Sequence, residues 1–176
     1  MFMIGPNLLL RAPEPADIDT LFRWENDMRI WHLGNTLTPY SRFAIEQFVL
    51  NTTDDIFASK QLRLMIDWHS SGPEAITVGS IDLFDFDPFH MRAGIGILID
   101  ESSRQKGFAS EALELLIQYC FNTLNLHQLY CNIEQGNTDS IRLFTKAGFV
   151  ECGNKKEWLL RKGNWTDELI FQLIKH

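Results

Sequence analysis

Residues 104–109, Arg-Gln-Lys-Gly-Phe-Ala, are the segment of this chain with the clearest chemistry. A glycine and a small residue two positions apart at the start of a helix let backbone N–H groups converge on an anion, helped by the positive end of the helix dipole. Arg104 and Lys106 would add full positive charges beside those N–H groups. The segment predicts an anion site that suits a diphosphate, although a basic loop before a helix is also typical of a plain solvated surface.

Two common phosphate-binding patterns are missing from this segment. It lacks the Gly-Lys-Ser/Thr ending of a Walker A loop, and its glycine spacing is not that of a Rossmann fingerprint. Mononucleotide hydrolysis and hydride transfer therefore both lose support.

A second group of residues that could form a motif lies at residues 137–149. It consists of Asn137, Ser140, Lys146 and Gly148, followed by Phe149. By local physics alone this is a capped amphipathic helix that a glycine ends.

The elements that must position these segments follow from the periodicity of apolar residues. Leu62, Leu64 and Ile66 alternate with polar or flexible residues, which predicts a strand, and residues 107–121 carry one broad apolar helical face. Thr38 before Pro39 predicts the N-cap of a helix near the N-terminus, after a first helix that begins at about Ala16. The remaining predicted elements are strands at 8–11, 76–84, 92–100, 129–133, 157–162 and 168–174, a turn at 70–73 and a helix at 140–148.

This order of elements predicts an α+β fold in one domain, residues 1–176. We expect a single mixed, mostly antiparallel sheet of about seven strands, with helices on both faces.

Composition narrows the class of partner. A net charge of −7 and a pI near 5.2 argue against nucleic acid and suit a cationic small substrate. No apolar run approaches the roughly 18 residues that a membrane span needs, so we expect no membrane partner and a cytoplasmic location. The three cysteines are widely spaced, without metal-ligand spacing, and no metal is expected.

The two groups of residues together, in this order and about 30 residues apart, resemble the GCN5-related N-acetyltransferase (GNAT) family. Arg104, Gly107 and Ala109 match its pyrophosphate-loop pattern Gln/Arg-x-x-Gly-x-Gly/Ala, and residues 137–149 match its second motif, Asn...Ser...Lys-x-Gly-Phe. Residues 125–127 and 163–167 are similar to the branch that holds ribosomal-protein N-terminal acetyltransferases and spermidine or diamine N-acetyltransferases.

The resemblance implies a sheet that splays open at the strand ending near Asp100, with acetyl-CoA in the gap as cosubstrate. Backbone groups of Ile97, Leu98 and Ile99 would pair with the pantetheine arm, and Asn137 would meet the cofactor near the far strand. The pyrophosphate would be held by the loop and the first helical turn, which comprise Arg104, Gln105, Lys106, Gly107, Phe108, Ala109 and Ser110.

The implied reaction is direct attack by a substrate amine on the thioester in a ternary complex. An alkylamine with a pKa near 10.4 must lose a proton before it attacks. Many members carry a tyrosine as general acid where this chain has Phe144, which cannot donate a proton. Candidate bases are Glu134, Asp82, Asp85 and His127, each of which is more often a solvated surface group, and a water chain would serve as well.

Three functions remain open at this point. The first is N-acetylation of a primary amine, either of a polyamine-like small molecule or of a protein N-terminus. The second is a non-catalytic acyl-CoA-binding or sensing module, which Phe144 motivates, and the third is an interaction domain with a solvated basic loop. The oligomeric state is also open, a homodimer included.

Overall fold

The computed structural model describes residues 3–31, 36–51, 55–69 and 75–175. Contacts divide the chain into two compact units, Met1–Ala12 with Ile56–His176, and Pro13–Asp55. That the whole chain acts as one acetyltransferase domain stays a prediction. The turn predicted at 70–73 lies outside the described residues.

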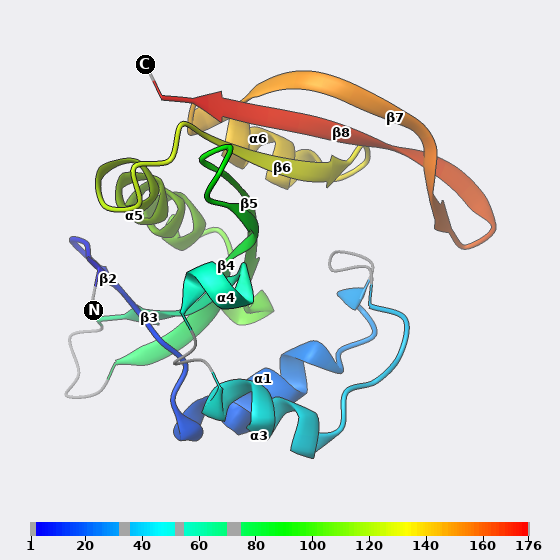
Figure 1. Cartoon of the computed structure of the whole chain (residues 1–176). Helices are drawn as coiled ribbons and strands as arrows, with labels where there is room; N and C mark the ends of the chain where they lie inside the picture. Colours follow the sequence, from blue (N-terminus) through cyan, green and yellow to red (C-terminus); the bar gives the residue numbers. More distant parts are fainter. Residues whose placement is uncertain (1–2, 32–35, 52–54, 70–74, 176) are drawn as a thin grey trace. The chain divides into compact units, whose positions relative to one another are not determined.

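The larger unit is built on one eight-stranded sheet, in which the strands follow the order β1-β2-β3-β4-β5-β6-β8-β7 (Figure 1). Every neighbouring pair is antiparallel except β5 and β6, which are parallel. The strands are β1 (Met3–Ile4), β2 (Leu8–Arg11), β3 (Leu62–Trp68), β4 (Ile76–Asp87), β5 (Arg92–Ile99), β6 (Gln128–Glu134), β7 (Val150–Arg161) and β8 (Asn164–Ile174). The predicted α+β class with a mixed, mostly antiparallel sheet is confirmed, and the two-residue β1 is the strand beyond the seven expected.

The helices of this unit are α4 (Ile56–Ser59), the 3₁₀ turn η2 (Glu101–Ser103), α5 (Phe108–Asn122) and α6 (Thr138–Lys146). Helix α5 buries Ala112, Leu113, Leu116 and Cys120 at helical spacing, as its apolar pattern predicts. These side chains join one core cluster with the inward residues of β2 to β6, to which each buried aliphatic side chain contributes about 1.5–3 kcal/mol.

A carboxylate ties α5 to the edge of the sheet. Glu111 accepts hydrogen bonds from the backbone N–H of Asn7 at 2.8 Å and of Leu8 at 2.9 Å, and from the Asn7 amide at 2.9 Å. The start of β2 thus has its donors satisfied by a helical side chain, which fixes α5 against that strand.

The sheet opens between β5 and β6. They pair only where Arg92 to Gly94 lie opposite Gln128 to Tyr130, although β5 continues to Ile99 and β6 to Glu134. Beyond that point β5 stays paired with β4, and β6 stays paired with β8 over its whole length. Each strand is therefore held by its other neighbour while the two diverge, which confirms the predicted splay.

The smaller unit holds the 3₁₀ turn η1 (Pro15–Asp17) and the helices α1 (Ile18–Glu25) and α3 (Arg42–Leu50). The prediction that Thr38 caps the second helix is wrong, because the Ser41 hydroxyl accepts from the Ala44 N–H and α3 starts after it. The Asn26 side chain accepts from the Tyr40 N–H and donates to the Tyr40 carbonyl, which holds this residue outside the helix.

The closing hairpin is longer than the sequence indicates. Strand β7 starts at Val150 rather than at 157, and β8 starts at Asn164 rather than at 168. The first half of β7 is the outermost strand of the sheet and is mostly exposed, so it carries no alternation of apolar and polar residues that would reveal it.

Candidate active site

The predicted anion loop lies between η2 and α5. Gly107 is the N-cap of α5 with φ of +85°, a left-handed conformation that favours glycine, and Gln105 also has a positive φ of +62°. The carbonyl of Gly107 accepts from the N–H groups of Ser110 and Glu111. Among the described residues no side chain caps this helix end, and the N–H groups of Phe108 and Ala109 have no described hydrogen-bond partner.

Two cations flank these N–H groups. Arg104 donates from Nε to the Ile99 carbonyl at 3.2 Å, which ties the loop to the end of β5, and both Arg104 and Lys106 are exposed. Phe108 is buried instead, with its ring 5.5 Å from that of Trp68. Its side chain therefore anchors the loop to the core, and only its backbone is available to an anion.

The edge of β5 leads toward this loop. Ile97, Leu98 and Ile99 are half-buried and pair with β4 on one side, and no described strand pairs with them on the side that faces β6. Free backbone N–H and C=O groups on such an edge bind extended chains, although the Ile99 carbonyl already accepts from Arg104. A strand edge followed by a cationic loop at a helix N-terminus fits a ligand with a linear amide arm and a diphosphate.

Asn137 has a structural role at the second motif. Its Oδ1 accepts from the Ser140 N–H at 3.2 Å and caps α6. Its contact with a cofactor stays a prediction.

Both carboxylates named first as base candidates are in ion pairs. Asp82 Oδ1 lies 2.7 Å from Arg63 Nε, and Glu134 Oε2 lies 2.8 Å from Arg161 Nε. Arginine holds a carboxylate as an ion and as a hydrogen-bond acceptor. These partners are structural, so a role as general base stays a prediction for either residue.

Phe144, at the position where a tyrosine general acid would be expected, lies in the hydrophobic core. Phe144 is only 3% exposed and its ring packs edge-to-face on that of Phe149, with centroids 5.1 Å apart. His127, another base candidate, is exposed. The structure brings neither of them together with the other candidates through any contact that it describes.

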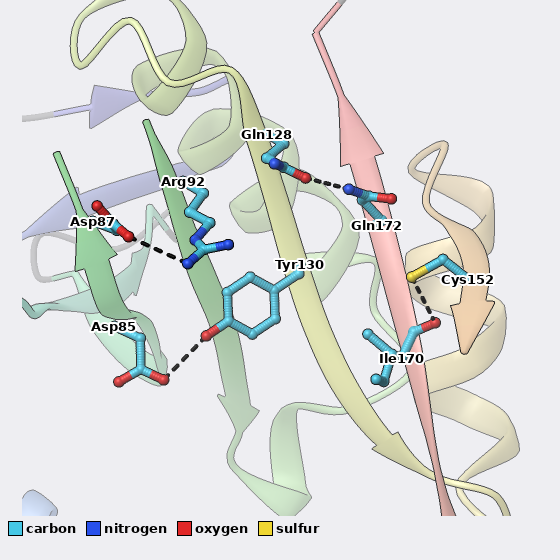
Figure 2. Close-up of a pocket in the computed structure, with 8 residues that line it drawn as sticks. All are labelled: Asp85, Asp87, Arg92, Gln128, Tyr130, Cys152, Ile170 and Gln172. Carbon is cyan, nitrogen blue, oxygen red and sulfur yellow. Dashed lines mark hydrogen bonds and ion pairs between the residues drawn. The ribbon is translucent and has the colours of Figure 1, made fainter. Parts of the chain in front are cut away.

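Asp85, in contrast, lies beside a pocket of about 500 Å³ on one face of the sheet (Figure 2). Tyr130 reaches from β6 toward β4 and donates its hydroxyl to Asp85 Oδ2 at 3.0 Å. Burial, and next the Asp85 carboxylate, raise the pKa of Tyr130 to about 12. The pocket is lined by Asp85, Asp87, Arg92, Gln128, Tyr130, Cys152, Ile170 and Gln172.

Of the residues around this pocket, only Asp85 is identifiable from the sequence as a site candidate. Tyr130 lies 45 positions from Asp85, and Gln172 lies opposite Tyr130 only because of the register between β6 and β8. A signal in the sequence exists only in the alternation of β6, whose polar or aromatic positions 128, 130 and 132 share the face opposite the core.

The three cysteines differ in environment. Burial raises the pKa of the Cys120 thiol and of the Cys131 thiol to about 12, whereas Cys152 is exposed at the pocket. Among the described residues, no three His, Cys, Asp or Glu side chains are grouped as metal ligands. None of the helices in the described part of the chain is both long and apolar enough to cross a membrane.

The chain is similar to known acetyltransferases over nearly its whole length. The family model described as an acetyltransferase (GNAT) domain matches residues 7–150. The N-acetyltransferase p20 of Bacillus licheniformis, itself uncharacterized, is 29% identical over 168 residues, which cover 96% of this chain and 93% of the relative. The spermidine N(1)-acetyltransferase of Vibrio cholerae serotype O1 is 30% identical over 164 residues, which cover 93% and 91%.

Solved structures share the fold. The spermidine N-acetyltransferase from Vibrio cholerae, solved with CoA and spermine, matches with a TM-score of 0.85 and 23% identity, over 97% of this chain and 96% of that one. The motif at the helix N-terminus, the splayed sheet and the match of the family model agree. The chain belongs to the GNAT family of acetyltransferases and is an N-acetyltransferase.

Proposed function

We propose that this protein transfers the acetyl group of acetyl-CoA to a primary amine of a polyamine-like small molecule. The observation that carries the proposal is the open edge of β5, which leads to the cationic loop before α5. The spermidine acetyltransferases among its relatives and the net charge of −7 support a cationic acceptor.

In this proposal, the N–H groups at residues 105–109 with Arg104 and Lys106 hold the diphosphate, whereas the Ser110 N–H donates to the Gly107 carbonyl. The edge of β5 at Ile97, Leu98 and Ile99 aligns the pantetheine arm. The acceptor ammonium first loses a proton to a base or to water, and its nitrogen then forms a bond to the thioester carbonyl carbon. The carbon–sulfur bond breaks, CoA leaves as the thiolate, and the second amine proton goes to that thiolate or to water. Asp82, Glu134, Asp85 and His127 remain the base candidates, of which only the first two are held by arginine in the described structure.

Two measurements test the proposal: the binding of acetyl-CoA and the formation of an acetylated amine. Acetyl-CoA at 100 times its Kd should stabilise the folded protein by about 2.7 kcal/mol. This stabilisation is measured as a rise in the Tm in thermal unfolding. Mass spectrometry then follows acetylation of spermidine, of 1,4-diaminobutane and of a peptide with a free N-terminus. Acetylation of the peptide alone would replace the small amine by a protein N-terminus as acceptor.

Binding without any acetylated product would favour the second candidate, an acyl-CoA-binding module. The observation on its side is the buried phenyl ring of Phe144, which leaves that position without a proton donor. The cytoplasmic location and a homodimer stay predictions.

A further inference from the structure

We propose that the pocket between Asp85 and Gln172 is the acceptor site of this enzyme, and that the Asp85 carboxylate binds an ammonium group of the acceptor that is not acetylated. The assignment rests on the proposed function. It goes further by naming the residue that would make a diamine a better substrate than a monoamine.

Tyr130 lies opposite Gly94 in the last residue pair before β5 and β6 separate. The gap between β5 and β6, in which the pantetheine arm is predicted to lie along the edge of β5, begins on the other side of this point. We call this gap the channel. The pocket and the channel therefore meet at the apex of the splay, where a thioester at the end of the pantetheine arm would be expected.

Two aromatic rings pack together where β5 and β6 separate. The ring of Phe84 packs edge-to-face on Tyr130 at 5.8 Å between centroids. A Cβ at Gly94 would lie 2.3 Å from the Phe84 ring, so only glycine permits this arrangement. The aromatic pair holds the Tyr130 hydroxyl toward Asp85 rather than toward the core.

The charged residues that line the pocket are Asp85, Asp87 and Arg92. Asp87 Oδ1 accepts from the N–H groups of Phe89 and His90. Asp87 Oδ2 lies 3.3 Å from Arg92 Nη2, so Asp87 already balances the positive charge of Arg92 (Figure 2). The partner described for Asp85 is the neutral Tyr130 hydroxyl. The described lining thus carries two carboxylates and one cation, and the exposed Asp85 carboxylate is available to a cation that enters the pocket.

The neutral groups around Asp85 suit an ammonium group as well. With its pKa raised to about 12, Tyr130 stays protonated near neutral pH, so it orients Asp85 as a donor and its oxygen can still accept an N–H. Across the pocket, Gln172 donates to Gln128 through its amide nitrogen, which leaves its carbonyl oxygen as an acceptor. The site therefore takes a linear alkyl chain with a cationic group, which describes a diamine or polyamine.

The kinetic test compares two acceptors of equal chain length, 1,4-diaminobutane and butylamine. Asp85→Asn removes the charge but tolerates the left-handed backbone at this position, where φ is +49°. A charge-assisted contact of this kind corresponds to about a tenfold preference in kcat/KM for the diamine, which D85N should abolish. Glu114→Gln, which removes the same charge from the exposed face of α5, should keep the preference. The KM for acetyl-CoA should be unchanged in both variants.

A second readout needs no turnover. Cys152 lines the pocket and is exposed, whereas Cys120 and Cys131 are buried with high pKa values, so iodoacetamide near pH 8 should alkylate Cys152 alone. Millimolar 1,4-diaminobutane should slow this alkylation several-fold in the wild type and in E114Q, and not in D85N. Intact-protein mass measures the rate.

The outcomes separate the two proposals. If the enzyme acetylates diamines but D85N keeps their preference over butylamine and they leave Cys152 unprotected, the acceptor binds elsewhere and the pocket assignment is overturned. If diamines protect Cys152 only while Asp85 is present, yet no amine is ever acetylated, the pocket binds diamines through Asp85 but is not an acceptor site, and the proposed reaction fails.

Discussion

Gly107→Ala should weaken coenzyme A binding without touching any side chain that contacts the ligand. Gly107 has a φ of +85°, and a Cβ placed there meets no atom within 4 Å, so the substitution acts through the backbone alone. A residue with a Cβ pays roughly 1–2 kcal/mol to hold the left-handed conformation. A free-energy difference of 1.4 kcal/mol changes an equilibrium constant about tenfold. About 3–20% of the variant molecules would therefore keep the native loop conformation, in which the N–H groups of Phe108 and Ala109 are available to the anion.

Because apparent affinity scales with the fraction of the competent conformation, the Kd for CoA should rise roughly 5- to 30-fold. Titration calorimetry with CoA measures this value. The matched control is Gly163→Ala in the turn between β7 and β8, where φ is +86° and a Cβ also meets nothing within 4 Å. Both variants should unfold a few degrees earlier, since about 1 kcal/mol shifts the Tm of a protein of this size by about 2–4 °C.

Only the Gly107 variant should lose CoA affinity. The reasoning is refuted if Gly107→Ala binds CoA as tightly as the wild type, since the loop would then not be the anion site. It is equally refuted if Gly163→Ala loses the same affinity, because the effect would then follow from general destabilisation.

Three further predictions concern the core, the sheet edge and the pocket. Phe144→Tyr should lower the free energy of unfolding by about 1–3 kcal/mol and not raise kcat, because the new hydroxyl enters a position that is 3% exposed; a faster enzyme with unchanged stability would contradict this. Glu111→Ala should cost about 2 kcal/mol in urea unfolding, because it leaves backbone donors at the start of β2 unpaired, whereas Glu114→Ala should stay within about 0.5 kcal/mol. The pKa of Tyr130 is raised from 10.0 to about 12 in the folded state, so its contribution to stability is full below pH 10 and is lost as the pH rises through 12. In Tyr130→Phe, unfolding measured from pH 9 to 12 should therefore show a shallower loss of stability than in the wild type, and identical slopes would count against it.

The parts of the chain that the sequence determines are those whose pattern reports local geometry. Leu62, Leu64 and Ile66 alternate because one face of β3 packs on the core, and α5 shows its face through Ala112 and Leu116. The anion loop is also local, because it needs only a glycine at the N-cap and a helix behind it. These features, with the second motif, suffice for the fold class and the family.

Other features depend on contacts that no local pattern carries. Ser41 rather than Thr38 caps α3 because Asn26 holds Tyr40 outside the helix, and an exposed edge strand such as the start of β7 shows no periodicity. Asp82 and Glu134 are equally plausible bases in the sequence, until the register of the sheet and the hairpin place Arg63 and Arg161 beside them.

The sequence by itself thus determined most strands, helix α5 and the anion loop, because periodicity, capping and glycine conformation act within a few residues. Only the tertiary structure decided where β5 and β6 separate, and only it joined Tyr130 to Asp85 across 45 positions of sequence. The reason is physical: strand register and splay follow from the simultaneous pairing of every strand with its neighbours, so the pocket at the apex is a property of the whole sheet.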